Sequence, residues 1–165
     1  MTHLVPYAQD KGLATIAAAG LMTTIGVCGI AGRLFSGWLS DQVDTRLVLC
    51  GGIIVQCIMM LVLIGAQASW LFYTFAICFG LSYGGNIVLI PKLTSQIFGV
   101  RSMASIFGAL SVADGLGFGF GPLLAGYVYD HTSRYTLSFL VVPAGLAAAA
   151  VMTMALSDAS PPPSR

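Results

Sequence analysis

Residues 102–129 read SMASIFGALSVADGLGFGFGPLLAGYVY, an apolar, glycine-rich stretch with one charged residue, Asp114, near its middle. A helix that crosses a membrane needs about 20 mainly apolar residues, so this stretch is long enough to be one. A charge at the centre of such a helix costs roughly 2.5–3.5 kcal/mol on insertion scales. Charges at that depth usually face a bundle interior or a water-filled path, so we expect Asp114 to carry function.

The rest of the chain has the composition of a membrane protein. Of its 165 residues, 57% are hydrophobic and 8% are charged, and the mean hydropathy is +0.90. A soluble domain carries about 25% charged residues, because its surface must be solvated. The net charge of +1 excludes a nucleic-acid footprint, which needs clustered Lys and Arg. Membrane lipid is therefore the expected surrounding of this chain.

Charged residues divide the chain into long uncharged blocks. Residues 12–32 and 135–157 carry no charge, and each block has room for one span. The 45 uncharged residues from 47 to 91 would form a straight helix of about 68 Å, more than twice the thickness of the hydrocarbon core. This block must fold back, and its small, polar segment at residues 65–69 is the expected turn.

We therefore predict an all-α integral membrane bundle of five transmembrane helices. The predicted spans are residues 13–35, 47–66, 70–92, 103–128 and 135–156. They form one domain, residues 1–157, and the proline-rich residues 158–165 form a cytoplasmic tail. A cleaved signal peptide is the alternative for the first span, but its apolar run is too long and no basic segment precedes it.

The distribution of basic residues predicts the orientation. Five spans put the two ends of the chain on opposite sides of the membrane. With the N-terminus outside, five of the seven Lys and Arg residues fall on the inner side, as the positive-inside bias requires. We expect the chain in a plasma (inner) membrane with its C-terminus in the cytoplasm. An outer N-terminus without a signal sequence indicates that a further segment precedes residue 1.

Residues 32–46, GRLFSGWLSDQVDTR, form the predicted first inner loop. Gly37 allows close approach of a neighbouring helix, while Asp41 can pair with a basic group or a helix terminus and latch an inner gate. Arg46 closes this charged segment. The alternative is a solvated turn whose charges only stop membrane insertion.

Arg33 lies about one turn from the inner end of the first span. Gly37 and Asp41 follow at i+4 and i+8, on nearly the same face of a helix. The guanidinium either extends to the lipid headgroups or turns inward and binds a carboxylate with paired hydrogen bonds. The sequence leaves both possibilities open.

Two polar residues of the third span, Tyr83 and Asn86, are candidates for the lining of a polar cavity. An Asn in a membrane helix equally often forms hydrogen bonds across a helix interface, so this second role stays open. In the fourth span, Asp114, Gly117 and Gly121 are spaced i, i+3, i+7 and share a face. That spacing lets another helix pack closely beside the acid.

Two segments resemble motifs of the major facilitator superfamily. Gly37, Asp41 and Arg46 match its cytoplasmic signature Gly-x-x-x-Asp-Arg-x-Gly-Arg-Arg, from which this chain departs at residues 42, 44 and 45. Gly121-Pro122, followed by Gly126, resembles the Gly-Pro-x-x-x-Gly segment of the penultimate helix. Pro122 locally weakens that helix. The resemblance implies helices 8–12 of a twelve-helix fold, that is, the C-terminal half.

Residues 3–8, HLVPYA, resemble the outer end of helix seven in the monocarboxylate and oxalate–formate branch. In that branch, helix eight carries an arginine that engages the substrate carboxylate, and Arg33 falls at the matching place. Some members add an aspartate one turn earlier, where this chain has Gly29. Asp114 matches the acid that monocarboxylate carriers bear seven residues before their Gly-Pro.

The combined prediction is secondary transport of a small, monocarboxylate-like organic anion, either proton-coupled or by exchange. Substrate binding is assigned to Arg33, Tyr83 and Asn86, and proton coupling to Asp114. The partner is an N-terminal transporter half that this sequence does not contain. The alternative is a truncated or split, non-transporting fragment or subunit that needs such a half.

An enzyme is not expected, because the sequence offers no paired inner carboxylates, no His cluster and no Ser-His-Asp set. No cofactor or metal is expected either. The four cysteines lie inside predicted spans without the paired spacing of metal ligands, and we interpret them as small packing residues.

Overall fold

The computed structural model describes residues 4–66, 68–132 and 135–155, the side chains of residues 118, 122–141 and 144 excepted. All regular elements of the described residues are helices, as predicted. They are α1 (Leu4–Asp10), α2 (Thr15–Gln42), α3 (Thr45–Gly65), α4 (Ser69–Phe98), α5 (Val100–Thr132) and α6 (Tyr135–Ala155). Within the described residues, α2, α3, α4 and α5 are long and apolar enough to cross a membrane. The prediction of an all-α membrane bundle is confirmed.

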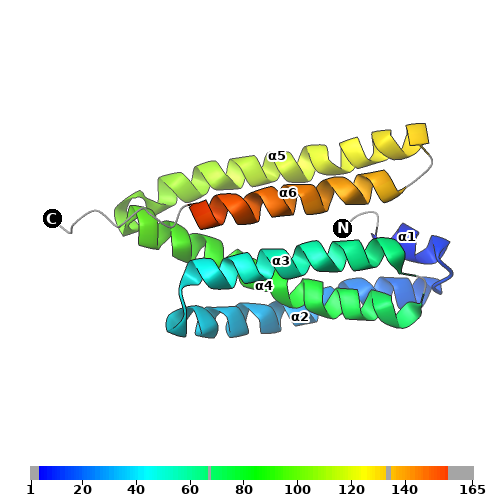
Figure 1. Cartoon of the computed structure of the whole chain (residues 1–165), viewed down its shortest axis with the longest axis horizontal. Helices are drawn as coiled ribbons and strands as arrows, with labels where there is room; N and C mark the ends of the chain where they lie inside the picture. Colours follow the sequence, from blue (N-terminus) through cyan, green and yellow to red (C-terminus); the bar gives the residue numbers. More distant parts are fainter. Residues whose placement is uncertain (1–3, 67, 133–134, 156–165) are drawn as a thin grey trace.

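The long helices run side by side and form an elongated bundle (Figure 1). In this bundle α4 is central, because it packs against α2, α3 and α5. On the other side of α3 lies α6, which also contacts α5. The short helix α1 lies at one end of the bundle and contacts α2. The packing thus separates α2 from α5, the two helices that carry Arg33 and Asp114.

The segment predicted as the first inner loop is mostly helical. Helix α2 continues to Gln42, seven residues beyond the predicted end of the first span, and only Val43 and Asp44 connect it to α3. No proline interrupts this segment, so its backbone keeps the helical hydrogen bonds beyond the apolar block. Asp44 then caps α3, accepting a hydrogen bond from the backbone N–H of Arg46 at 2.8 Å. The loop prediction was wrong because charge ends a membrane span without ending a helix.

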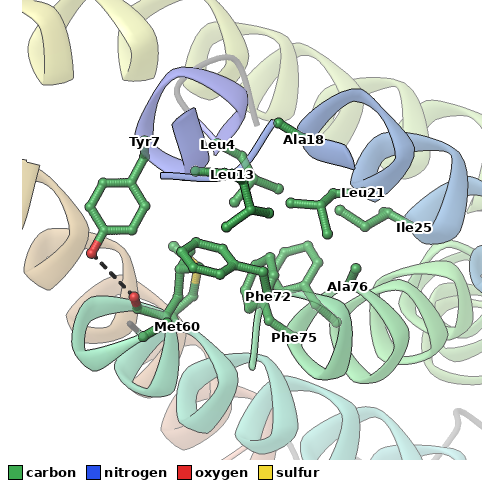
Figure 2. Close-up of a cluster of buried hydrophobic side chains, with 14 residues drawn as sticks. Leu4, Tyr7, Leu13, Ala18, Leu21, Ile25, Met60, Phe72, Phe75 and Ala76 are labelled. Atoms are coloured by element: carbon green, nitrogen blue, oxygen red, sulfur yellow. Dashed lines mark hydrogen bonds between the residues drawn. The ribbon is translucent and has the colours of Figure 1, made fainter. Parts of the chain in front are cut away.

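At the other end of the bundle, α1 is held by an apolar cluster and by one tyrosine (Figure 2). The hydroxyl of Tyr7 donates to the backbone carbonyls of Leu63 and Ile64, at 3.3 and 3.2 Å. These carbonyls belong to the last turn of α3, where no further backbone N–H of the helix is available to donate to them. Burial raises the pKa of the Tyr7 phenol, so the group stays protonated and able to donate.

Five glycines bring α2 and α4 into backbone contact: Gly29, Gly32, Gly80, Gly84 and Gly85. We call this set the glycine contact. A Cβ on Gly80 would lie 2.8 Å from the carbonyl oxygen of Ile25, and a Cβ on Gly84 would overlap the carbonyl of Gly29. Small residues at a membrane helix interface permit this approach, and the resulting van der Waals packing holds the helices together.

Replacing Gly84 by Ala tests the glycine contact. The added Cβ meets backbone rather than a movable side chain, so the helices must separate, at a cost of about 1–3 kcal/mol. Thermal unfolding in detergent should show a lower Tm for Gly84→Ala. The matched control is Gly26→Ala, because a Cβ there has no atom within 4 Å. Equal Tm values for the two variants would contradict the contact.

Candidate functional site

The glycine contact fixes how α2 and α4 are aligned. Along α4, Gly84 lies against Gly29. The next residue, Gly85, lies against Ser36, which is further along α2. The two helices therefore run in the same direction. A residue next to a contact glycine on one helix therefore lies at the same height along the bundle as the residues opposite that glycine on the other helix.

Arg33 follows Gly32 and is exposed at the edge of the glycine contact. Its guanidinium forms no ion pair with any residue that the structure describes. One turn earlier, Gly29 has its backbone against α4, so no carboxylate of α2 is available there. The side chain offers five N–H donors in a planar fork, a geometry that matches a carboxylate.

Tyr83 precedes Gly84 and lies at the end of an aromatic stack on α4. Its ring stacks on Phe79 at a centroid distance of 5.9 Å, and Phe79 stacks on Phe75 at 5.0 Å. Phe79 is buried, whereas Tyr83 is 36% exposed. The stack supports the ring from one side and leaves part of the residue accessible. Tyr83 is thus available to a ligand on the surface of the bundle.

Asn86 points away from that surface, toward α3. A Cβ atom added to Gly52 would lie 2.5 Å from Asn86 Oδ1. The same oxygen is buried and has no hydrogen-bond partner among the described residues. Of the two roles that the sequence left open, the geometry favours the helix interface over the cavity lining.

Asp114 lies on α5 and is exposed. Gly117 and Gly121 follow it on the helix, and a Cβ on either would have no atom within 4 Å. The face that these three residues share is therefore uncovered by the described part of the chain. Pro122 belongs to α5, but its side chain is outside the described residues.

A polar cluster joins the C-terminal parts of α2 and α4. Lys92 forms an ion pair with Asp41 and donates to the hydroxyl of Ser40 at 2.8 Å. Ser40 in turn donates to the carbonyl oxygen of Gly37, also at 2.8 Å. Asp41 thus pairs with a basic group, as predicted. Sequence reasoning missed that this group is Lys92, because 51 residues separate the two and only the parallel packing of α2 and α4 joins them.

The predicted substrate-binding and proton-coupling residues therefore fall into three separate places. Arg33 and Tyr83 flank the glycine contact, Asn86 lies between α3 and α4, and Asp114 lies on α5. Gly37 and Asp41 are in the last turns of α2, and Arg46 is in the first turn of α3. Helices of the described chain do not bring Arg33 and Asp114 onto a common packing surface.

The Asp41–Lys92 pair should contribute little stability by itself. The side chain of Asp41 is 73% exposed and that of Lys92 is 26% exposed, so water screens the attraction. A double-mutant cycle of Asp41→Asn and Lys92→Met, read by unfolding in detergent, should give a coupling below about 1 kcal/mol that salt weakens. A larger, salt-independent coupling would mean that the pair is buried in the folded protein.

The fold and these sites define an integral membrane protein whose helices present polar and charged groups within an apolar bundle. Comparison with known proteins gives the family. The sequence pattern of the Major Facilitator Superfamily matches residues 3–165, and the chain belongs to this family.

Over the aligned residues, known relatives are about a third identical to the chain. Monocarboxylate transporter 12 of Rattus norvegicus is 32% identical over 148 residues, covering 84% of this chain and 29% of the relative. Monocarboxylate transporter 11 of Homo sapiens is 32% identical over 149 residues, covering 84% and 31%. Monocarboxylate transporter 13 of Rattus norvegicus is 30% identical, covering 88% and 35%. The chain thus spans about a third of the length of these relatives.

Proposed function

We propose that this chain is part of a secondary carrier that moves a small organic anion of the monocarboxylate type across a membrane. The observation that carries the proposal is Arg33, an exposed guanidinium beside the glycine contact with no ion-pair partner among the described residues. The family and the names of the relatives support a transporter rather than an enzyme.

Arg33 acts as the carboxylate-binding group in this proposal. A guanidinium binds a carboxylate through two parallel hydrogen bonds, which fixes the orientation of the anion as well as its charge. Tyr83, at the accessible end of its aromatic stack, adds a hydroxyl and an apolar ring for the rest of the substrate. In this proposal Asn86 contributes to the α3–α4 interface and does not bind the substrate.

Asp114 supplies the proton site or the balancing charge. A carboxylate on a helix that crosses the membrane takes up a proton on one side and releases it on the other only if the protein changes conformation between the two steps. The glycines at 117 and 121 leave the face around Asp114 open to a second helix. Proton coupling and exchange are the two modes that fit this arrangement.

The uncovered face of α5 needs a partner, which we propose is an N-terminal half of the carrier. Alternating access then comes from rocking of one half against the other around a central site. The glycine contact keeps α2 and α4 together during this movement. The Asp41–Lys92 pair, with Gly37 and Arg46 beside it, lies at the inner ends of these helices and serves the inner gate. In this proposal the chain lies in a plasma membrane, with its N-terminus on the outer side.

A non-transporting subunit or fragment is the second candidate. It is favoured by the same open face of α5, because the described helices by themselves leave Asp114 uncovered. Uptake by the chain alone, compared with the chain co-expressed with an N-terminal half, separates the two. Uptake that appears when the N-terminal half is added supports the carrier, whereas no uptake with or without that half supports a non-transporting subunit or fragment.

Substitution of Arg33 tests the substrate site. In proteoliposomes with a complete carrier that contains this chain, Arg33→Ala should reduce uptake of labelled monocarboxylates by roughly 10-fold or more, the value of a lost charge-assisted hydrogen bond. Arg33→Lys should recover part of the uptake, because it keeps the charge without the planar fork. Arg101→Ala, at an exposed position of α5, is the control. Full uptake by Arg33→Ala would refute the proposed role.

Substitution of Asp114 tests the coupling. Asp114→Asn cannot exchange a proton, so a proton-coupled carrier should lose the stimulation of uptake by an inward proton gradient. The control is Ser111→Ala, a polar position one turn earlier on α5. The measurement is uptake with and without an imposed pH gradient. Unchanged proton-driven uptake by Asp114→Asn would remove this residue from the mechanism.

A further inference from the structure

Two amide side chains on the neighbouring helices α3 and α4 each have one buried atom that makes no hydrogen bond within the described residues. Gln56 is 4% exposed and lies near the middle of α3, and its Nε2 makes no hydrogen bond within the described residues. Asn86 lies on α4, and its Oδ1 is likewise buried and unpaired there. An unpaired donor on α3 and an unpaired acceptor on α4 therefore belong to two helices that pack against each other.

The α3 backbone places Gln56 one turn beyond the point where Asn86 meets this helix. Asn86 Oδ1 lies against Gly52, which has no side chain to displace it. Gln56 follows Gly52 by one turn on the same face of α3, a rise of about 6 Å along the helix axis. Side chains on a helix lean toward its N-terminus, so the Gln56 amide is directed back toward the level of Gly52, where a water molecule can lie between it and Asn86 Oδ1.

Both residues belong to helices that are long and apolar enough to cross a membrane. A buried polar group needs a partner, and in hydrocarbon the penalty for lacking one is larger than in a soluble protein. Buried waters in proteins typically satisfy two to four such groups. We infer that the α3–α4 interface contains a structural water site, in which the water accepts from Gln56 Nε2 and donates to Asn86 Oδ1.

The water site gives α3 and α4 a polar connection in the middle of the membrane. The face of α4 that carries Asn86 thus packs against α3, while its glycine face packs against α2. This connection does not depend on the proposed transport, since it requires only the two amides and the space at Gly52.

A double-mutant cycle tests whether the amides share one partner. Gln56→Met and Asn86→Leu each remove one amide with little change of volume, and each leaves the other amide unsatisfied. Each single variant of the chain should lower the Tm in detergent by roughly 2–8 °C. The double variant should regain most of that loss. Additive losses would overturn the proposal.

Gly52→Ala tests the position of Asn86 without removing either amide. The new Cβ would force the Asn86 oxygen out of its place, so the Tm should fall as in Asn86→Leu. Gly51→Ala is the matched control, because a Cβ there has no atom within 4 Å. A Gly52→Ala variant as stable as the control would overturn the site.

The ligand itself is tested by an experimental structure of the protein at a resolution that shows ordered water. The expected result is a solvent peak within hydrogen-bond distance of both Gln56 Nε2 and Asn86 Oδ1. A direct hydrogen bond between the two amides, or an interface without solvent, would refute the water site even if the cycle is non-additive.

Discussion

The backbone contact between α2 and α4 is the constraint on which the rest of the structure depends. In lipid, apolar side chains gain nothing by leaving one apolar surface for another, so helices associate through close packing and polar contacts. The glycines supply the close packing, because they let the carbonyls of one helix touch the Cα atoms of the other. The levels of Arg33 and Tyr83, and the meeting of Asp41 with Lys92, all follow from this alignment.

Three parts of the surface of helix α4 make different contacts. Its glycine face packs on α2, its Asn86 face packs on α3, and its aromatic stack ends at the partly accessible Tyr83. Helix α5 differs, because its described glycines and Asp114 face open space. The described part of the chain therefore combines a tightly packed group of three helices with one helix whose Asp114 face is uncovered. This asymmetry suits a carrier half that moves as a body.

Much of the fold could be predicted from the sequence because a membrane span is a local property. Long uncharged blocks identify the helices, and the oversized block of residues 47–91 must turn, as it does between Gly65 and Ser69. Helix ends were less predictable, because α2 continues through polar residues to Gln42. The sequence allowed Asp41 to pair with a basic group or with a helix terminus. The identity of the partner as Lys92 depended on packing between distant segments.

The sequence by itself determined that this protein is a helical membrane bundle of the major facilitator type, and it marked Arg33 and Asp114 as its conspicuous charges. These conclusions rest on composition, spacing and motifs, which neighbours in space do not alter. Only the tertiary structure decided that Asn86 faces α3 and that Gln56, one turn from Gly52, is buried. The physical reason is that helical periodicity fixes which residues share a face, whereas the packing of whole helices fixes what that face meets.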